Sequence, residues 1–274
     1  MSKKHEEKKE TAVEKHDSKA GAVAAPLDVE GDAGGGFEAA DKAAYAIPFL
    51  SIIQALSPQL KKGNAKYIDG SEEGDIFNSV TNDLFKAEKG LLVIPCFYKQ
   101  EYIEWADRKN PRPGEGTGPF NTFPPHHPII AATPAVNGAR TLENGHILSD
   151  TREHFVMVLN TDGRVSPAVI TMSSTQVKRS MQWMSIMHEQ KMTGSRGNVF
   201  TPPMFAIVYH ISTHNEENKR GQSWKGYAIK KYGTVDNPDL YAMCRKFRDD
   251  VKVGAVKTAE PLADAEAETD ETPF

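Results

Sequence analysis

Apolar residues recur in five short runs through the middle of the chain, and each run predicts a β-strand. The runs lie at residues 91–98, 154–159, 167–172, 204–212 and 223–231. They are rich in branched and aromatic side chains, which favour extended backbone. Because proline cannot donate a hydrogen bond to a neighbouring strand, Pro95 predicts an edge or a bulge in the first run.

Two of the intervening segments predict hairpins. Residues 160–164 join the second and third runs and contain an Asp-Gly step, which favours a tight turn between antiparallel strands. The polar residues 213–222 join the fourth and fifth runs as a second hairpin.

Helical periodicity is present in two further segments. In the first, Ser173 as N-cap and Gln176 as the third helical residue fit a capping box. The face that this periodicity predicts consists of Val177, Met181, Met184 and His188, while Lys178, Gln182, Ser185 and Glu189 form a polar stripe.

The second helix is predicted to begin with Asn237 as N-cap and Pro238 as its first residue. Gly254 is placed to end it. Its apolar stripe is Leu240, Met243, Cys244, Phe247 and Val251.

The chain divides into three parts, and its body is predicted to be mainly β with α, an α+β fold. Residues 1–36 and 257–274 contain few large apolar side chains, which predicts a disordered N-terminal arm and a disordered acidic C-terminal tail. Residues 37–256 would form a single domain that can bury a sizeable core. Within it, the Pro- and Gly-rich residues 110–134 predict a long irregular loop.

Charge is distributed unevenly along the chain. The net charge is -4, yet residues 37–256 hold 26 basic and 23 acidic residues. Residues 176–231 alone hold 9 basic and 3 acidic residues, whereas residues 257–274 hold one lysine and six acids. A basic body between acidic ends indicates an anionic partner.

Composition excludes several classes of protein. No stretch approaches the ~18 consecutive apolar residues of a membrane span, and no apolar run of a secretory signal follows the charged start. Cys96 and Cys244 lie far apart, so they form neither a metal-spaced pair nor a disulfide framework. A reducing cytoplasm, the host's if the protein is viral, is the expected compartment.

Signatures of enzymes are absent from the sequence, including phosphate-binding loops, dinucleotide fingerprints, nucleophile elbows and zinc-hydrolase motifs. The pair His126-His127 lies in a polar loop without further ligands at metal spacing. The acids Asp69, Glu72, Glu73 and Asp75 could bind a divalent cation, but their setting is more typical of an exposed turn. We therefore expect a binding protein with no catalytic residues, no cofactor and no metal.

Basic and aromatic residues are interleaved in several segments, a mixture that suits single-stranded nucleic acid because rings stack on bases while cations contact phosphates. The candidate DNA-binding residues are Tyr98, Lys99, Lys178, Arg179, Trp183, Trp224, Lys225, Tyr227, Lys230 and Lys231. On a strand, Lys225, Tyr227 and Lys231 share one face and Trp224 and Lys230 share the other, so which face meets DNA stays open. Each segment alone also fits a core aromatic residue beside a solvated lysine.

The end of the chain carries the most specific signal. Residues 269–274, TDETPF, follow an alanine-rich acidic run. This tip resembles that of single-stranded DNA-binding proteins, in which acids precede a hydrophobic residue, proline and a final phenylalanine, and whose phage members end in an acidic tail with a terminal aromatic. Asp270, Glu271, Pro273 and Phe274 match the pattern, and Thr272 replaces the larger apolar residue.

The resemblance implies a fold and a partner. The fold would be an OB-like five-stranded barrel with two helices, and with insertions at residues 106–150 and before Leu91. The tip would place the Phe274 ring in an apolar pocket of a replication or recombination protein, with its acids on a basic rim.

The leading hypothesis is a phage-type protein that coats and protects single-stranded DNA during replication, recombination or repair and recruits partners through its tip. The alternatives are a virion or scaffold structural protein and a metal-dependent nuclease that uses the four acids. No membrane partner is expected, and homo-oligomerisation stays open.

Overall fold

The structure is a computed structural model that describes residues 33, 35–40, 44–110, 112–136, 138–219 and 221–259. Residue contacts divide the chain into Met1–Ala40 and Asp41–Phe274. The described part of the first unit contains turns. Most of the predicted arm, and the tip with Asp270, Glu271, Pro273 and Phe274, lie outside the described residues.

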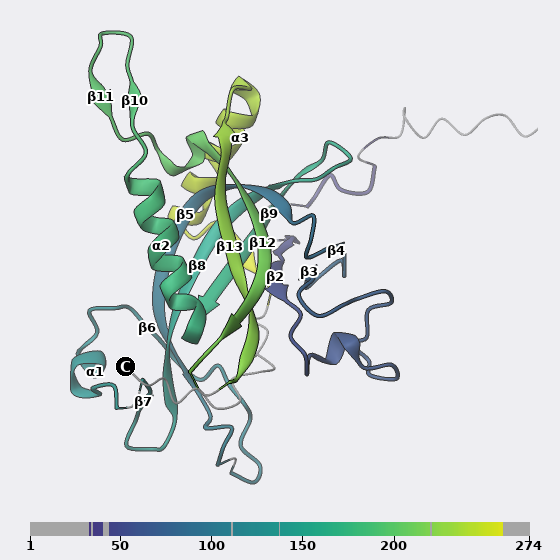
Figure 1. Cartoon of the computed structure of the whole chain (residues 1–274), viewed down its shortest axis with the longest axis vertical. Helices are drawn as coiled ribbons and strands as arrows, with labels where there is room; N and C mark the ends of the chain where they lie inside the picture. Colours follow the sequence, from purple (N-terminus) through teal and green to yellow (C-terminus); the bar gives the residue numbers. More distant parts are fainter. Residues whose placement is uncertain are drawn as a thin grey trace, which may run out of the picture. The chain divides into compact units, whose positions relative to one another are not determined.

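The second unit is mostly β-structure, with three α-helices among its described residues (Figure 1). Its main sheet contains β2 (Phe49–Ile52), β3 (Ile76–Asn78), β4 (Leu84–Phe85), β5 (Leu91–Trp105), β6 (Thr122–Phe123), β7 (Arg140–Thr141), β8 (Ile147–Leu159), β9 (Val165–Ser173), β12 (Ile207–Glu217) and β13 (Ser223–Thr234). Two further pairs are β1 (Ala46–Ile47) with β14 (Lys257–Thr258), and β10 (Met192–Thr193) with β11 (Val199–Phe200). The helices are α1 (Pro128–Ala132), α2 (Val177–His188) and α3 (Pro238–Lys252), and short 3-10 turns lie at Pro58–Leu60, Ser174–Gln176 and Met204–Ala206.

The sheet has the neighbour order β13-β12-β5-β8-β9-β2-β3-β4, with β6 paired to β5 and β7 to β8. Strands β5, β8 and β9 are consecutive antiparallel neighbours, and β12 returns to lie beside β5. This arrangement is that of a Greek key, in which the fourth strand pairs with the first.

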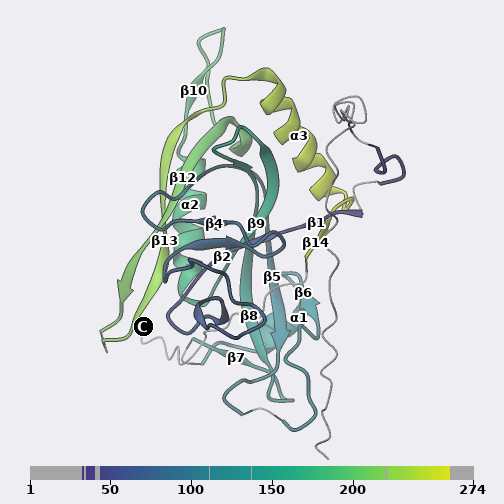
Figure 2. The same cartoon turned by 90° about the vertical axis from the view of Figure 1, so that its right-hand side faces the viewer.

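Contacts between distant strands show that the sheet is curled into a half-barrel. The Tyr227 hydroxyl on β13 donates to the Leu50 carbonyl on β2 at 3.0 Å, although four strands separate β13 from β2 in the sheet order. The Gln54 side chain accepts from the Lys225 amide and donates to the Lys225 carbonyl, both at 2.9 Å. Side-chain hydrogen bonds thus join the two sides of the curled sheet. Figure 2 shows how the strands are arranged.

Alternate residues of the strands build two hydrophobic clusters, one on each face of the sheet. Val156 and Val158 of β8 belong to the first cluster, which contains Trp183 and Met187 of α2. Phe155 and Met157 belong to the second, which contains Cys244 and Phe247 of α3. Because successive side chains of a strand point to opposite faces, α2 and α3 cover opposite faces of one sheet.

Each of the five predicted runs lies in a strand, although β12 begins at Ile207 instead of Met204. The bulge expected at Pro95 is confirmed, because the β5–β8 register shifts between Pro95 and Phe97. The second predicted helix is confirmed with Asn237 as its cap, since the Asn237 side chain accepts from the amides of Asp239 and Leu240.

Three expectations are wrong. The segment 110–134 contains β6 and α1 and is not wholly irregular. The capping box does not form, because Ser173 makes no side-chain cap bond and the Gln176 side chain accepts from the Tyr227 amide at 3.2 Å. The helix count is three instead of two in the described part of the chain.

Candidate nucleic-acid interface

Helix α2 packs on the sheet through a different face from the predicted one. Ser180, Trp183 and Met187 are its buried residues, whereas Met181 of the predicted face is 53% exposed. Positions three and seven residues after Ser180 lie on one side of a helix. The bulkiest ring of this segment therefore belongs to the core and fixes the helix on the sheet.

Trp183 lies in a row of aromatic side chains beneath α2. Its ring stacks on His154 at 4.5 Å between centroids and meets Tyr209 edge-on at 5.7 Å. On the other side, His154 lies 5.2 Å from the ring of Tyr98. Burial lowers the pKa of His154 to about 3, so the ring is neutral, and its Nε2 lies 2.8 Å from the Ser180 hydroxyl.

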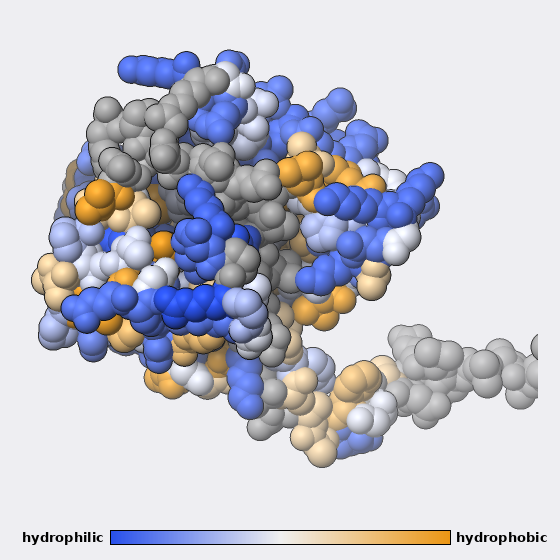
Figure 3. Space-filling model, turned by 90° about the horizontal axis from the view of Figure 1, so that it is seen from below, coloured by the Kyte–Doolittle hydropathy of each residue, from blue (hydrophilic) through white to orange (hydrophobic). Residues whose placement is uncertain are grey.

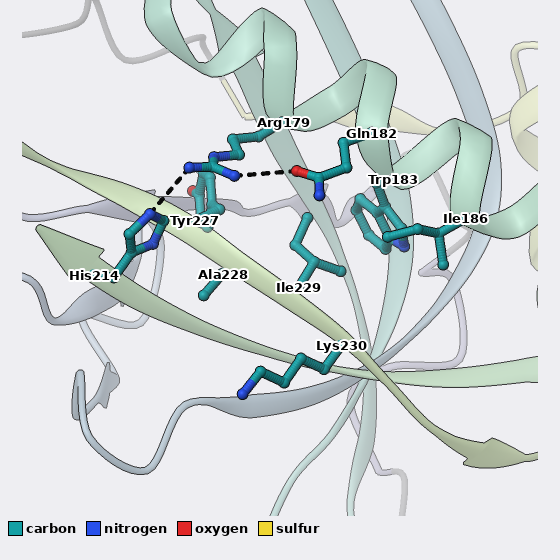
Figure 4. Close-up of a pocket in the computed structure, with 9 residues that line it drawn as sticks. All are labelled: Arg179, Gln182, Trp183, Ile186, His214, Tyr227, Ala228, Ile229 and Lys230. Atoms are coloured by element: carbon teal, nitrogen blue, oxygen red, sulfur yellow. Dashed lines mark hydrogen bonds between the residues drawn. The ribbon is translucent and has the colours of Figure 1, made fainter. Parts of the chain in front are cut away.

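A pocket of about 250 Å³ lies between α2 and the two strands β12 and β13 (Figure 4). Arg179, Gln182, Trp183 and Ile186 come from the helix, His214 comes from β12, and Tyr227, Ala228, Ile229 and Lys230 come from β13. Four of the ten predicted DNA-binding residues line it: Arg179, Trp183, Tyr227 and Lys230. Segments that are about 50 residues apart in sequence thus meet at one pocket.

The carboxylate of Glu216 fixes the position of the Arg179 side chain. Its Nε donates to Glu216 Oε1 at 2.8 Å, and its two terminal nitrogens lie 3.1 Å from Gln182 Oε1 and 3.1 Å from His214 Nε2. The Trp224 indole donates to the other oxygen of Glu216 at 3.1 Å. A Cβ on Gly226 would lie 2.3 Å from Glu216, so glycine at this position lets the carboxylate cross the strand.

The remaining predicted cations are distributed around this region. Lys178 on α2 and Lys230 and Lys231 on β13 are exposed, and Lys231 donates to Gln190 at 2.7 Å. Lys225 is only 22% exposed and lies 3.9 Å from Glu73, so it faces an acid of the chain. Lys99 on β5 is paired with Glu101 at 2.6 Å.

The predicted rings differ in their access to solvent. Trp183 is 0% and Tyr227 3% exposed, so neither offers a free ring face, which corrects the expectation for both. Tyr98 and Trp224 are half-buried, and Tyr232 on β13, 67% exposed, was not among the candidates. Tyr227 faces the interior with Ile229, so the Lys230 face of β13 is the outer one.

Gln182, Ile186, His214 and Glu216 are the residues of this region that the sequence analysis missed. In the β12–β13 hairpin, His214 lies opposite Gly226 and Glu216 lies opposite Trp224. The hairpin was predicted, so its register could have placed both side chains beside the candidate residues.

Three of the four acids proposed for a divalent cation lie near lysine side chains of the same chain. Asp75 is 2% exposed and accepts from Lys86 at 2.8 Å and from the Ala87 amide at 3.0 Å. Glu72 lies 3.7 Å from Lys86, and Glu73 lies near Lys225. Within the described ranges, no group of three His, Cys, Asp or Glu side chains could hold a metal ion.

The outer surface of the β5–β8 end is mixed. Figure 3 views the molecule from this end, where α1, β6 and β7 lie, and shows mainly hydrophilic side chains with separate hydrophobic patches. The exposed apolar side chains near these elements include Phe120, 39% exposed, and Val136, 68% exposed. None of the helices in the part of the chain that the structure describes is long and apolar enough to cross a membrane.

A family model for Pam3 phage gp34-like proteins matches residues 14–257. The chain belongs to this family. It is therefore a phage protein, as the sequence analysis expected. Comparisons with curated proteins and with solved structures find no match.

Proposed function

We propose that this phage protein binds and coats single-stranded DNA during replication, recombination or repair, through the edge of the sheet where β12 and β13 lie beside α2. The observation that carries the proposal is the pocket, because it joins two cations, Arg179 and Lys230, to apolar and aromatic walls. A protein that binds single-stranded nucleic acid needs cations that contact the phosphates and aromatic surfaces on which the bases stack.

The fold supports the proposal through its strand order. The Greek key of β5, β8, β9 and β12, extended by β13, suits an OB-like barrel of five long strands with α2 between the third and fourth. OB folds bind oligonucleotides on the face of their second and third strands and through the loops after their first and fourth strands. The corresponding loops here are the connections β5–β8 and β12–β13.

The exposed lysines 178, 230 and 231 are the proposed phosphate contacts, and Trp224 is the proposed stacking ring. Lys225 and Lys99 are weaker candidates because each already lies near a carboxylate. If Trp224 stacks on a base, Trp224→Ala weakens binding by ~1–3 kcal/mol.

The acidic tip is proposed to recruit a replication or recombination protein through Asp270, Glu271, Pro273 and Phe274. A ring next to acidic side chains suits a small apolar pocket with a basic rim. Phe274→Ala removes no charge, so it should abolish capture of that partner and leave DNA affinity unchanged. A variant that still captures every partner of the wild type would reduce the tip to a solubilising segment.

A titration of the full chain with oligo-dT and with a duplex of equal length tests the proposal. We expect tighter binding to the single strand, with an affinity that falls between about 50 and 200 mM salt as counterions are released. Equal affinity for both, or no binding to either, would refute the proposal. Metal-dependent cleavage of the oligonucleotide would identify a nuclease instead.

A further inference from the structure

His146, in the turn before β8, lies between two carboxylates at the end of the β5–β8 pair. Its Nδ1 lies 2.6 Å from Glu104 Oε1, and its Nε2 lies 2.8 Å from Glu115 Oε1. His146 is 8% exposed and Glu104 is 4% exposed, so both groups are largely shielded from water. This cluster is separate from the pocket beside α2, whose lining residues come from α2, β12 and β13.

The geometry fixes the protonation state of the His146 ring. A carboxylate oxygen only accepts hydrogen bonds, so each ring nitrogen must carry a proton, whereas a neutral imidazole has only one N–H group. The side-chain amides of Asn121 and Asn144 donate to Glu104 at 2.6 and 3.0 Å, which keeps Glu104 ionised and leaves both protons on the ring. The hydrogen bonds with Glu115 and Glu104 accordingly raise the pKa of His146 above its ordinary value of 6.5.

The protonated ring holds residues 112–121, the latch segment, against the turn before β8. Glu115 of this segment faces the ring nitrogen Nε2. Phe120 of the same segment stacks on the His146 ring, with centroids 4.6 Å apart and an interplanar angle of 19°. The Phe120 amide also donates to the Glu104 carbonyl at 2.9 Å. Ion pairing and ring stacking on one imidazole thus fasten the segment to the sheet.

The charged side chains that contact this cluster come from two elements. Glu104 belongs to β5, and Glu115 and Arg112 belong to the latch segment. Arg112 lies 3.9 Å from Glu115 and donates to the Asn144 carbonyl. With the His146 ring protonated, the two positive and two negative charges balance. Loss of the ring proton leaves one negative charge in excess between the two carboxylates.

We infer that His146 is a pH-sensitive latch, which closes the latch segment on the end of the sheet when its ring is protonated and releases the segment when the ring is neutral. The neutral ring keeps its proton on Nδ1, because Glu104 is fixed in β5 and faces that atom at the shorter distance. Nε2 then presents a lone pair to the Glu115 carboxylate. Two acceptors at hydrogen-bond distance repel each other, so Glu115 moves away with its segment.

The sign of the pH dependence follows from linkage. The folded chain holds the His146 proton more tightly than the unfolded chain does. The latch therefore stabilises the fold fully below pH 6.5, the pKa of the unfolded chain, and this contribution is lost as the pH rises through the higher pKa of the folded chain.

The latch does not depend on the proposed function, since all of its groups belong to the chain itself. If that function is correct, the latch also sets the position of the β5–β8 connection. This connection corresponds to one of the two loops through which an OB fold binds oligonucleotides.

Limited digestion of the full chain with chymotrypsin at pH 6 and pH 9 tests the latch. The measured quantity is the rate of cleavage after Phe120 divided by the rate after Phe200, which lies on β11. The two rings are similarly exposed, at 39% and 40%, and the division removes the pH dependence of the protease itself. Cleavage of a transiently opened segment follows the population of the open form. The ratio should rise about tenfold from pH 6 to pH 9, the contribution of a hydrogen bond to a charged group.

Two variants identify the groups responsible. The Glu115→Gln side chain can accept from a ring N–H or donate its NH₂ to a ring lone pair, so the segment should stay closed and the ratio low at both pH values. His146→Gln should give a ratio that does not change with pH. Glu143→Gln, an exposed acid of the same turn, is the matched control and should keep the wild-type rise.

An equal ratio at both pH values in the wild type would overturn the latch, as would the full wild-type rise in folded His146→Gln. If His146→Gln does not fold, Glu115→Gln decides the question, because a tenfold rise in that variant would also overturn the latch. Each of these results would leave the proposed function intact.

Discussion

The two faces of the curled sheet are covered by helices of similar length but different chemistry. On one face, α3 buries Cys244 and Phe247 in an apolar cluster, and none of the residues that line the pocket come from it. On the other face, α2 leaves a pocket with two unpartnered nitrogens and an arginine held by Glu216.

The α3 face thus contributes mainly to stability, whereas the α2 face also offers a binding site. A helix whose stripe is apolar and whose cap is formed needs no ligand to complete its contacts. Buried polar atoms without hydrogen-bond partners are costly, and among the described residues they occur beside both helices: Arg248 Nε on α3, 3.0 Å from Asp249 Oδ1, and Trp183 Nε1 on α2. The α2 side differs in its pocket, and it is therefore the place to look for a ligand.

Removing the exposed lysines of β13 beside the pocket should have the largest effect on DNA binding. Lys230→Gln with Lys231→Gln should weaken oligo-dT binding about tenfold and make the salt dependence less steep by about one unit for each phosphate that is no longer neutralised. The matched control is Arg245→Gln with Lys246→Gln, two exposed residues of α3 that carry the same charge. Equal effects of the two double substitutions would show that only net charge matters.

Deleting the acidic tail should have a smaller effect of opposite sign. Residues 260–274 contain six acids and no basic residue, and a tether keeps them at a local concentration of order millimolar. Their removal should tighten DNA binding roughly fivefold at low salt and less at higher salt, where charges are screened.

The deletion begins at residue 260 because Lys257–Thr258 pairs with β1 and the Ala259 amide donates to the Ile47 carbonyl. Thermal unfolding of the shortened chain controls for a change in fold. If the deletion weakens DNA binding, competition between tail and DNA is excluded.

Glu216→Gln should tighten DNA binding about threefold, because it frees Arg179 for a phosphate. Glu217→Gln removes the same charge from the next position of β12, which is exposed. A difference between the two variants measures the contact with Arg179, and identical titration curves would show that Glu216 does not compete with DNA.

His154→Gln should alter stability rather than binding. The pKa of His154 is lowered to about 3 in the folded state by burial, so the unfolded chain binds a proton that the folded chain does not. Stability therefore decreases as the pH falls from about 6.5 toward 3, by ~2 kcal/mol between pH 6.5 and 5. Denaturant unfolding at both pH values should show a weaker pH dependence in His154→Gln, and an unchanged dependence would assign the decrease to other groups.

Much of the α3 face was predictable, because its signals are local. The helix start is set locally by Asn237 and Pro238, and its end by Gly254. The apolar stripe from Leu240 to Val251 follows from helical periodicity alone. The one exception is Met243, which is 46% exposed.

The α2 face was predicted less well, because the side of the helix that is buried depends on contacts with residues distant in sequence. Apolar residues lie on more than one side of α2, so periodicity could not choose between Met181 and Trp183 for the core. Trp183 is the buried residue, and its ring stacks on the flat, neutral ring of His154. Gln176 likewise does not complete the expected capping box, because its side chain accepts a hydrogen bond from the amide of Tyr227, which is distant in sequence.

Only part of the site could be located from the sequence, for the same reason. Arg179 and Lys230 follow from charge and aromatic content alone, whereas His214 and Glu216 depend on the register of the β12–β13 hairpin. The short strands β1 to β4 carry weak patterns, so the partners of Leu50 and Gln54 across the half-barrel could not be inferred from sequence.

Photo-crosslinking measures directly which face meets DNA. Oligo-dT in which thymine is replaced by the photoreactive 5-bromouracil is irradiated with the full chain, and the linked peptides are identified by mass spectrometry. We expect crosslinks on α2, Val177–His188, and on β13, Ser223–Thr234. Crosslinks confined to α3, Pro238–Lys252, would show that DNA binds to the opposite face.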